Sequence, residues 1–233
     1  MSTPAPYRSP RTDATAATVL LAAAGAAALF SLYADALMFV ASDDLMTGSA
    51  VSGEAFADAQ WFIGTARVLQ WAVLVFSAMA FLSWFHRVRV NAEFLAPHGH
   101  RYARVWAIVG WFIPVANFWL PRQVAGDVWQ AGARPDGLGV REPLPQALLN
   151  LWWGTFLGSH LVGGLGDQFY QDATYADTYR EAALWLGAAD LLELAAAVFA
   201  VLLVRRLTAT QERLLAELPA GPVYGVHVST VEG

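Results

Sequence analysis

The chain has 233 residues, of which 57% are hydrophobic and 14% charged, and its formal net charge is -5. Several long apolar runs at this composition place it among membrane proteins and exclude an ordinary water-soluble domain. The sequence contains no cysteine, which excludes disulfides, thiolate metal sites and thiol catalysis.

The N-terminal segment predicts a disordered cytoplasmic leader over residues 1–13, because it contains three prolines and two arginines. Residues 14–41 follow as an apolar run, longer than the about 20 residues that cross a bilayer. A cleaved signal peptide is the alternative, since a basic start precedes this run. The run exceeds a signal core of about 7 to 15 residues, so we expect an uncleaved first span.

The second predicted span, residues 61–85, separates an acidic segment from a basic one. Residues 42–60 carry four acidic and no basic side chains, whereas the segment that follows the span is rich in histidine and arginine. Trp61 and Trp84 stand near its ends, where tryptophan anchors membrane interfaces. The positive-inside rule then assigns the basic segment and the N-terminus to the cytoplasm.

Residues 104–130 predict a broken element rather than a full span. Pro114 and Pro121 interrupt an apolar stretch, and each removes a helical hydrogen-bond donor. A full span would place the arginines that follow it outside, whereas a re-entrant or interfacial element keeps them in the cytoplasm. Broken backbone at membrane depth is tolerated where protein or a wet cavity satisfies it, which favours the second interpretation.

Two further spans are expected at residues 148–165 and 182–204, separated by an acidic, tyrosine-containing outer loop. The third contains Gly154 and Gly158 in GxxxG spacing, a weak signal for close helix approach. Residues 207–218 predict a cytoplasmic amphipathic helix, and residues 219–233 a disordered tail. The fold expected is an all-α integral membrane bundle of four full spans plus the proline-broken element.

The origin and location of the protein are inferred from its basic residues. All of them are arginine, which together with abundant alanine is typical of a GC-rich bacterial genome. We expect a multi-pass protein of a bacterial plasma membrane with both termini in the cytoplasm.

Five ionisable residues fall inside the predicted spans, where they are costly and commonly pair or line a wet cavity. In the four-span topology they gather in the outer half of the membrane, and we expect Arg67 to pair with one of the acids. A structural ion pair is the plainer interpretation, and a proton or cation site the sharper one. The cluster consists of Asp35, Arg67, His160, Asp190 and Glu193.

Catalytic and metal-binding patterns are weak. His86, His98 and His100 could bind a metal, but solvated loop histidines explain them better. No nucleophile elbow, phosphate loop or His-Glu-x-x-His helix occurs in the sequence. We therefore expect no enzyme, no cofactor and no metal site.

The chain resembles a bacterial membrane family known as domain of unknown function 4328, over roughly residues 61–207. The resemblance rests on a Trp-aromatic-x-Arg-x-x-x-Asn pattern, a Trp-Phe-x-Pro-x-x-Asn pattern, and a proline before an acidic residue and Trp. Arg122 departs from it, since the family often has an aromatic residue there. The residues carrying or accompanying these patterns are Trp84, Arg87, Asn91, Trp111, Pro114, Asn117, Pro121, Gln123, Asp127 and Trp129.

The resemblance implies a shared structural core but supplies no activity. We expect Asn91 and Asn117 to satisfy carbonyls freed by the two prolines; a ligand site on the cytoplasmic face is the alternative. The function predicted is a non-enzymatic scaffold or accessory subunit contacting a protein partner or lipid headgroups. The alternative is a small oligomeric proton- or cation-coupled carrier. Membrane lipids are expected partners, a homo-oligomer is an open option, and the absence of a basic stripe predicts no nucleic-acid partner.

Overall fold

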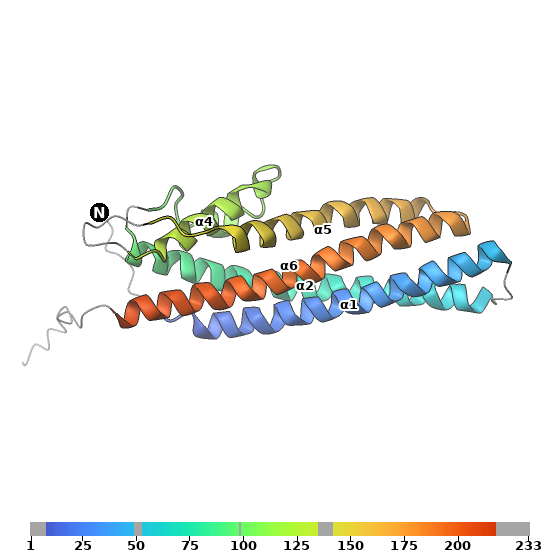
Figure 1. Ribbon diagram of the computed structural model, residues 1–233, viewed down its shortest axis with the longest axis horizontal. Helices are drawn as coiled ribbons and strands as arrows, with labels where there is room; N and C mark the ends of the chain where they lie inside the picture. The colour runs from blue at the N-terminus through green and yellow to red at the C-terminus, as the bar shows by residue number, and fades with distance from the viewer. Residues whose placement is uncertain (1–7, 49–52, 98, 135–141, 218–233) are drawn as a thin grey trace, which may run out of the picture.

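Four long helices form an antiparallel bundle in the computed structural model, which describes residues 8–48, 53–97, 99–134 and 142–217 (Figure 1). The long helices are α1 (Arg11–Thr47), α2 (Gly53–Leu95), α5 (Ala147–Asp172) and α6 (Ala176–Ala216). Between α2 and α5 lie α3 (Trp106–Val109), the 3-10 turn η1 (Ala116–Phe118) and α4 (Leu120–Ala131). The described segments contain no strand, which confirms the predicted all-α fold.

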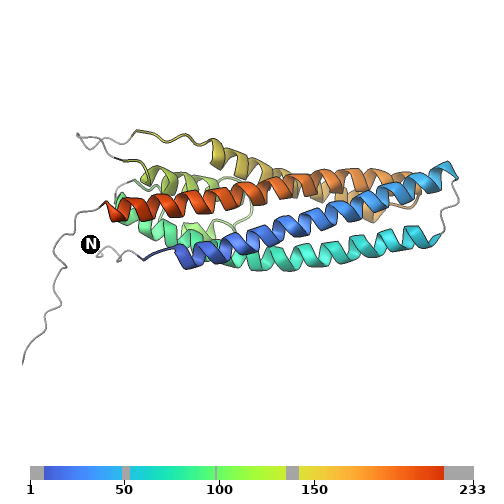
Figure 2. The same ribbon diagram turned by 60° about the horizontal axis from the view of Figure 1, so that its bottom comes forward.

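The connections between the helices fall at two opposite ends of the bundle (Figures 1 and 2). The α1–α2 and α5–α6 connections share one end, here called the acidic end. The other end gathers the start of α1, the end of α6 and all of the segment between α2 and α5, and is called the basic end. Among the described residues, every arginine except Arg67 and Arg180 lies toward the basic end.

Three of the helices are long and apolar enough to cross a membrane. They are α1, α2 and α6, with mean hydropathies of 1.9, 1.8 and 2.1 over their most apolar windows. α5 has 26 residues, so at about 1.5 Å per residue it is also long enough to cross a bilayer. Its most apolar window, however, has a lower hydropathy than those of α1, α2 and α6. These helices support an integral membrane protein, while α5 as the fourth span stays a prediction.

The helices extend beyond the spans expected from the apolar runs. α1 continues through Asp43 and Asp44 and ends only at Gly48, whose positive φ of 70° lets its N–H donate back to the Asp44 carbonyl. The two acidic segments are therefore largely helical, and the connections between helices are short. Hydropathy marks where a helix leaves lipid, whereas capping residues mark where it ends.

Both predicted terminal segments differ in part from the structure. Residues 11–13 already belong to α1, and residues 207–216 continue α6 without a break instead of forming a separate helix. Residues 1–7 and 218–233, the rest of the predicted leader and tail, lie outside the described residues. The predicted amphipathic helix is thus the end of a helix that is 41 residues long.

Small residues let α6 pack closely against its neighbours. A Cβ at Gly166 would meet Leu186 at 2.9 Å, and one at Gly158 would meet Leu192 at 3.4 Å. A Cβ at Gly154 would meet nothing within 4 Å, so only the second glycine of the GxxxG pair lies against a helix. α6 therefore occupies a central position, packed against α1 and α5, while α1 also packs against α2.

The proline-broken segment stays at the basic end and does not run the length of the bundle (Figure 1). Pro121 lies in the first turn of α4, where its missing N–H costs no hydrogen bond. Val115 has a φ of 68° and a ψ of -54°, and the N–H of Ala116 donates to the Pro114 carbonyl at 2.7 Å. This is a γ-turn with a strained β-branched centre, so the chain reverses sharply directly after Pro114.

Candidate functional site

Motif residues of α2 tie this helix to its neighbours at the basic end. The Trp84 side chain is fully buried, and its Nε1 donates to the Thr208 hydroxyl of α6 at 3.0 Å. One turn further along, Arg87 Nε donates to Asp13 Oδ2 of α1, also at 3.0 Å. These two side chains fix α2 to α1 and α6 near the level where the helices leave the predicted spans.

Asn91 forms a second buried link between the same helices. Its Nδ2 donates to the Arg8 carbonyl at 2.9 Å and to Gln211 Oε1 at 3.3 Å. Gln211, which is 1% exposed, in turn donates to the Val88 carbonyl of α2 at 2.9 Å. A buried amide pair of this kind is nearly satisfied, so Asn91 serves packing at the start of α1.

Arg89 is buried at the centre of the basic end, and sequence reasoning missed it. Only 1% of its side chain is exposed; NH1 donates to Glu93 at 2.8 Å, and NH2 donates to the Tyr102 carbonyl. Arg104 also donates to Glu93, so two guanidinium groups share one carboxylate. The i,i+4 spacing of Arg89 and Glu93 was the sequence signal that could have revealed this ion pair.

Asp127 and Gln123 of α4 hold the loop that follows α2. The backbone N–H of Arg101 donates to Asp127 Oδ2 at 3.0 Å, and Arg101 Nε donates to Oδ1 at 2.9 Å. Gln123 accepts a hydrogen bond from the Tyr102 hydroxyl through Oε1. The motif residues of α4 therefore orient this loop instead of facing solvent.

Tryptophans close the proline-broken segment onto α5. The Trp111 ring contacts Trp152 and Trp153 of α5, with centroids 6.3 and 5.7 Å away. Trp153 Nε1 donates to the Phe118 carbonyl at 3.0 Å. Trp129 packs elsewhere, since its Nε1 donates to the Pro145 carbonyl at 3.1 Å. Aromatic contacts and indole N–H groups thus hold the backbone around Pro114 and Pro121.

The expected role of the two motif asparagines is wrong. Asn91 binds Arg8 and Gln211, far from the prolines. The buried Oδ1 of Asn117 has no hydrogen-bond partner among the described residues, and an oxygen could not satisfy a carbonyl in any case. The Phe118 carbonyl, close to Pro121, instead accepts a hydrogen bond from the indole N–H of Trp153 on α5. An indole N–H is a donor and therefore a suitable partner for a free carbonyl.

His100 lies in the loop between α2 and α3 and introduces a pH dependence. Burial lowers the pKa of His100 from 6.5, and the nearby Arg89 guanidinium lowers it further. Among the residues that the structure describes, neither ring nitrogen of His100 has a partner in hydrogen-bonding geometry. His98, which was considered with it as a metal ligand, lies outside the described residues.

Acidification is expected to loosen the basic end through His100. The unfolded chain takes up its proton near pH 6.5, before the folded form does, so stability should fall below that pH until the folded pKa is passed. The measurement is the unfolding temperature in detergent at several pH values. His100→Gln should flatten the profile in this range, and an unchanged profile would contradict the assignment.

The five predicted intramembrane residues line one polar pocket, here called the outer pocket. It has a volume of about 360 Å³ and takes side chains from all four long helices. Asp35 on α1 and Asp190 on α6 are 4% and 6% exposed, and their carboxyl groups lie close enough to interact electrostatically. The residues brought together here are Asp35, Arg67, His160, Asp190 and Glu193, joined by Gln70 and Asp167.

Arg67 does not pair with the acids expected for it. Its NH2 lies 2.9 Å from Oδ1 of Asp167 on α5, and both side chains are part-exposed. Asp167 is nearer to Arg67 because α5 continues past the predicted span and carries this residue toward α2. The prediction that Arg67 neutralises Asp35, Asp190 or Glu193 is therefore wrong.

Gln70 replaces Arg67 as the direct polar neighbour of the buried acids. Its Nε2 donates to Asp190 Oδ1 at 2.8 Å and to Glu193 Oε2 at 3.3 Å. Oδ2 of both Asp35 and Asp190 remains without a hydrogen-bond partner of good geometry among the described residues. Four carboxyl groups thus line the pocket, and three of them, those of Asp35, Asp190 and Glu193, form no ion pair in the described part of the chain.

A second pocket, here called the inner pocket, adjoins the outer one on the side of the basic end. It has a volume of about 290 Å³ and is lined mainly by apolar side chains of the four long helices. Leu74, Ser159, His160 and Glu193 line both pockets. Trp111 and Phe112, from the proline-broken segment, line the inner pocket at its far end, so this segment closes the cavity that leads to the acids.

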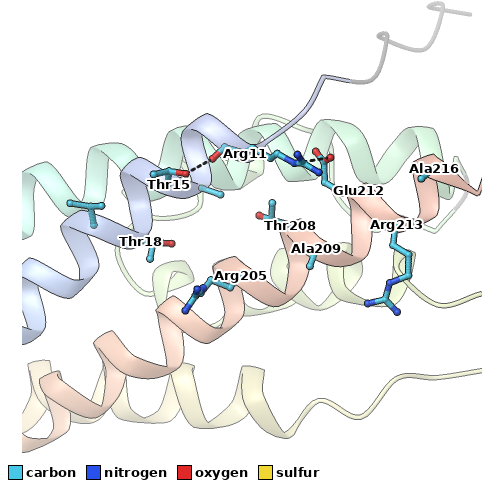
Figure 3. A pocket seen from close by; sticks show the side chains of 11 residues that line it. Arg11, Thr15, Thr18, Arg205, Thr208, Ala209, Glu212, Arg213 and Ala216 are labelled. Carbon is cyan, nitrogen blue, oxygen red and sulfur yellow. Dashed lines mark hydrogen bonds and ion pairs between the residues drawn. The ribbon is translucent and has the colours of Figure 1, made fainter.

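A third, open groove lies between α1 and α6 at the basic end (Figure 3). Arg11 crosses it and pairs with Glu212 at 3.0 Å, whereas Arg205 and Arg213 project from α6. Within the described residues, neither of these two arginines forms an ion pair. The groove of about 780 Å³ therefore presents unneutralised positive charge.

The described segments contain no group of three His, Asp or Glu side chains placed to hold a metal ion. At the basic end, most motif side chains bond to neighbouring helices or loops, whereas Asn117 Oδ1 and Trp111 Nε1 have no hydrogen-bond partner among the described residues.

Comparison with known proteins gives a family but no activity. No curated protein and no solved structure matches the chain. A family model described as domain of unknown function (DUF4328) matches residues 47–209. The match runs from the end of α1 into the last part of α6, and it includes every motif residue of the basic end and all of the outer-pocket residues except those of α1. The chain therefore belongs to the DUF4328 family, as its motifs indicate.

Proposed function

We propose that the protein is a small membrane carrier whose functional centre is the outer pocket and whose coupling ion is the proton. The observation that carries this proposal is that the buried carboxyl groups of Asp35 and Asp190, from two different helices, line the same pocket with Glu193. Intramembrane acids without a cationic partner are expensive to keep and commonly belong to proton or substrate paths. α5 serves as the fourth span, and the basic end faces the cytoplasm.

A proton would stabilise these two side chains in one pocket. Two buried carboxylates that lie close together repel each other unless a proton or a cation neutralises one of them. Glu193 is three residues from Asp190 on the same helical face and shares Gln70 with it, so a second acceptor is close by. His160, at the junction of the two pockets, can accept or donate a proton next to Glu193.

The outer pocket also has a route for protons from the acidic end. Arg67 and Asp167 line it, and their side chains are 28% and 47% exposed, in contrast to the buried acids. Because these side chains are part-exposed, we expect protons to enter the pocket beside this ion pair. The proline-broken element, re-entrant or interfacial, closes the other side through Trp111 and Phe112.

Proteoliposomes with an imposed pH gradient and a clamped membrane potential test the proposal. The protein is expected to speed the collapse of the gradient, and Asp190→Asn combined with Glu193→Gln should abolish the effect. Asp58→Asn is the matched control, because Asp58 is an exposed acid of α2 outside the pocket. Equal rates for the wild type, the double variant and protein-free liposomes would contradict the proposal.

A non-enzymatic scaffold or accessory role is the second candidate, and the groove of Figure 3 favours it. Arg205 and Arg213 are exposed and suit an acidic partner segment or anionic lipid headgroups. Arg87 and Asn91 are occupied within the bundle, so they make poor partner contacts. A partner that co-purifies with the wild type and is lost in Arg205→Gln with Arg213→Gln, but retained in Arg180→Gln, would support this role.

A further inference from the structure

We propose that the outer and inner pockets together form one binding site for a lipophilic organic cation, with the charge at the acids and the apolar body in the inner pocket. This proposal rests on the proposed carrier function and names its substrate class. The observations that carry it are the unpartnered buried carboxyl oxygens and the aromatic cavity that begins beside them.

The charge of the site requires a cation. Asp35 and Asp190 are more than nine-tenths buried. Within the described part of the chain, the Oδ2 atom of each has no hydrogen-bond partner. The nearest arginine, Arg67, is occupied by Asp167. A buried acid without a partner is costly, so a positively charged ligand gains from neutralising it.

The shape and polarity of the inner pocket require an apolar body on that cation. Its walls include Phe81, Trp111, Trp152 and Phe156, and their rings lie within 5.3 to 6.3 Å of a neighbouring ring. Aromatic faces attract a cation as well as an apolar group. A small inorganic cation would leave most of this apolar cavity unfilled, and a neutral apolar molecule would gain nothing from the acids.

Glu193 and His160 connect the two halves of the site. Both line both pockets, and the Phe156 and His160 rings are 4.5 Å apart. A cation whose charged centre lies at Glu193 would therefore extend its apolar groups along Phe156 toward Trp111. Each pocket alone is at the small end of ligand sites, about 300 Å³ and upward, and the two adjoining pockets offer more room.

Binding of the cation is expected to release a proton. The acids can hold a shared proton or the positive charge of the ligand. Both would bind at the same carboxyl groups, so the ligand displaces the proton. A carboxyl O–H bond breaks as the cation enters, and the proton is transferred to a water or buffer molecule; no other covalent bond changes. Affinity should consequently rise with pH, and protons should appear in solution in proportion to bound ligand.

Equilibrium dialysis of the full-length protein in detergent tests the proposal, with tetraphenylphosphonium as the probe and triphenylphosphine oxide as its neutral aromatic counterpart. We expect the cation to bind, the neutral compound to bind at least about tenfold more weakly, and a pH-indicator dye to report proton release. Glu193→Gln and Asp190→Asn should each weaken cation binding about tenfold or more. Asp58→Asn should leave it unchanged.

Phe156→Leu keeps the wall apolar but removes an aromatic face, and it should weaken the cation severalfold without changing proton binding. Equal binding of the neutral compound would show a nonspecific apolar groove and overturn the proposal. Binding that Glu193→Gln and Asp190→Asn both leave intact would also overturn it. Absence of cation binding in a protein that still collapses a pH gradient would reject this substrate class while leaving the proton-coupled carrier standing.

Discussion

Replacing Arg89 with methionine is expected to destabilise the protein by about 2 to 4 kcal/mol. The substitution removes a guanidinium that is 1% exposed and bonded to both Glu93 and the Tyr102 carbonyl. It leaves that carbonyl without its donor inside the basic end. We place the cost somewhat below that of a fully buried pair, since Glu93 is 24% exposed and keeps Arg104.

Arg104→Met provides the matched control for this prediction. Arg104 binds the same carboxylate but is 38% exposed, so its loss should cost only about 0 to 1 kcal/mol. Thermal unfolding in detergent, followed by far-ultraviolet circular dichroism, gives both values. Arg89→Lys should be intermediate, because an ammonium group lacks the planar fork that reaches two acceptors. Equal effects of Arg89→Met and Arg104→Met would contradict the central position of Arg89.

Neutralising Asp35 is expected to stabilise the protein by about 1 to 2 kcal/mol while abolishing its proton coupling. Asparagine has nearly the same shape as aspartic acid, and its amide can donate to the adjacent Asp190 carboxylate permanently. The substitution removes one of two buried acids that lie close together, and no ion pair is lost with it. A stabilised but inactive variant is the behaviour expected of a residue retained for function.

Asp167→Asn should act in the opposite direction and is the control for Asp35→Asn. It deprives Arg67 of its partner, and because the pair is part-exposed we expect a loss of about 0 to 1 kcal/mol. Unfolding temperatures of both variants in the same detergent compare the two effects. If Asp35→Asn lowers stability more than Asp167→Asn does, Asp35 is a structural residue and the proposed proton site is wrong.

The sequence predicted the fold class and the co-location of the outer-pocket residues for a simple reason. Apolar runs separated by charged segments define helices that alternate in direction, and residues at equal depth then become neighbours. Asp35, Arg67 and His160 lie at similar depths in the predicted spans, and they line one pocket.

Details that depend on helix ends and side-chain reach were not predictable in this way. The ion pair of Arg67 with Asp167 requires α5 to continue helically beyond its apolar run, which hydropathy does not report. The bonds of Asn91 to Arg8 and Gln211 join residues 83 and 120 positions apart, and no local pattern encodes such a contact. The burial of Arg89 was not predictable from the sequence, because a charged residue in a basic segment normally faces water.

The strained turn at Val115 belongs to the proline-broken segment at the basic end. A positive φ at an exposed β-branched residue is costly and persists only where the surroundings fix it. Trp153 and Trp111 provide that restraint by holding the segment on α5. The segment thereby keeps Trp111 and Phe112 at the end of the inner pocket. The shape of the inner pocket therefore depends on the packing of the basic end.

The placement of the two bundle ends on opposite sides of the membrane is the claim on which the account depends most. Because the chain has no cysteine, single cysteines report their own accessibility. Suitable exposed positions are Glu142 and Ala216 at the basic end, and Asp58 and Asp172 at the acidic end. With a membrane-impermeant maleimide on intact cells, cysteines at 58 and 172 should be labelled, and those at 142 and 216 only after lysis. Labelling of position 142 from outside, together with 172, would contradict the four-span arrangement and the outer pocket with it.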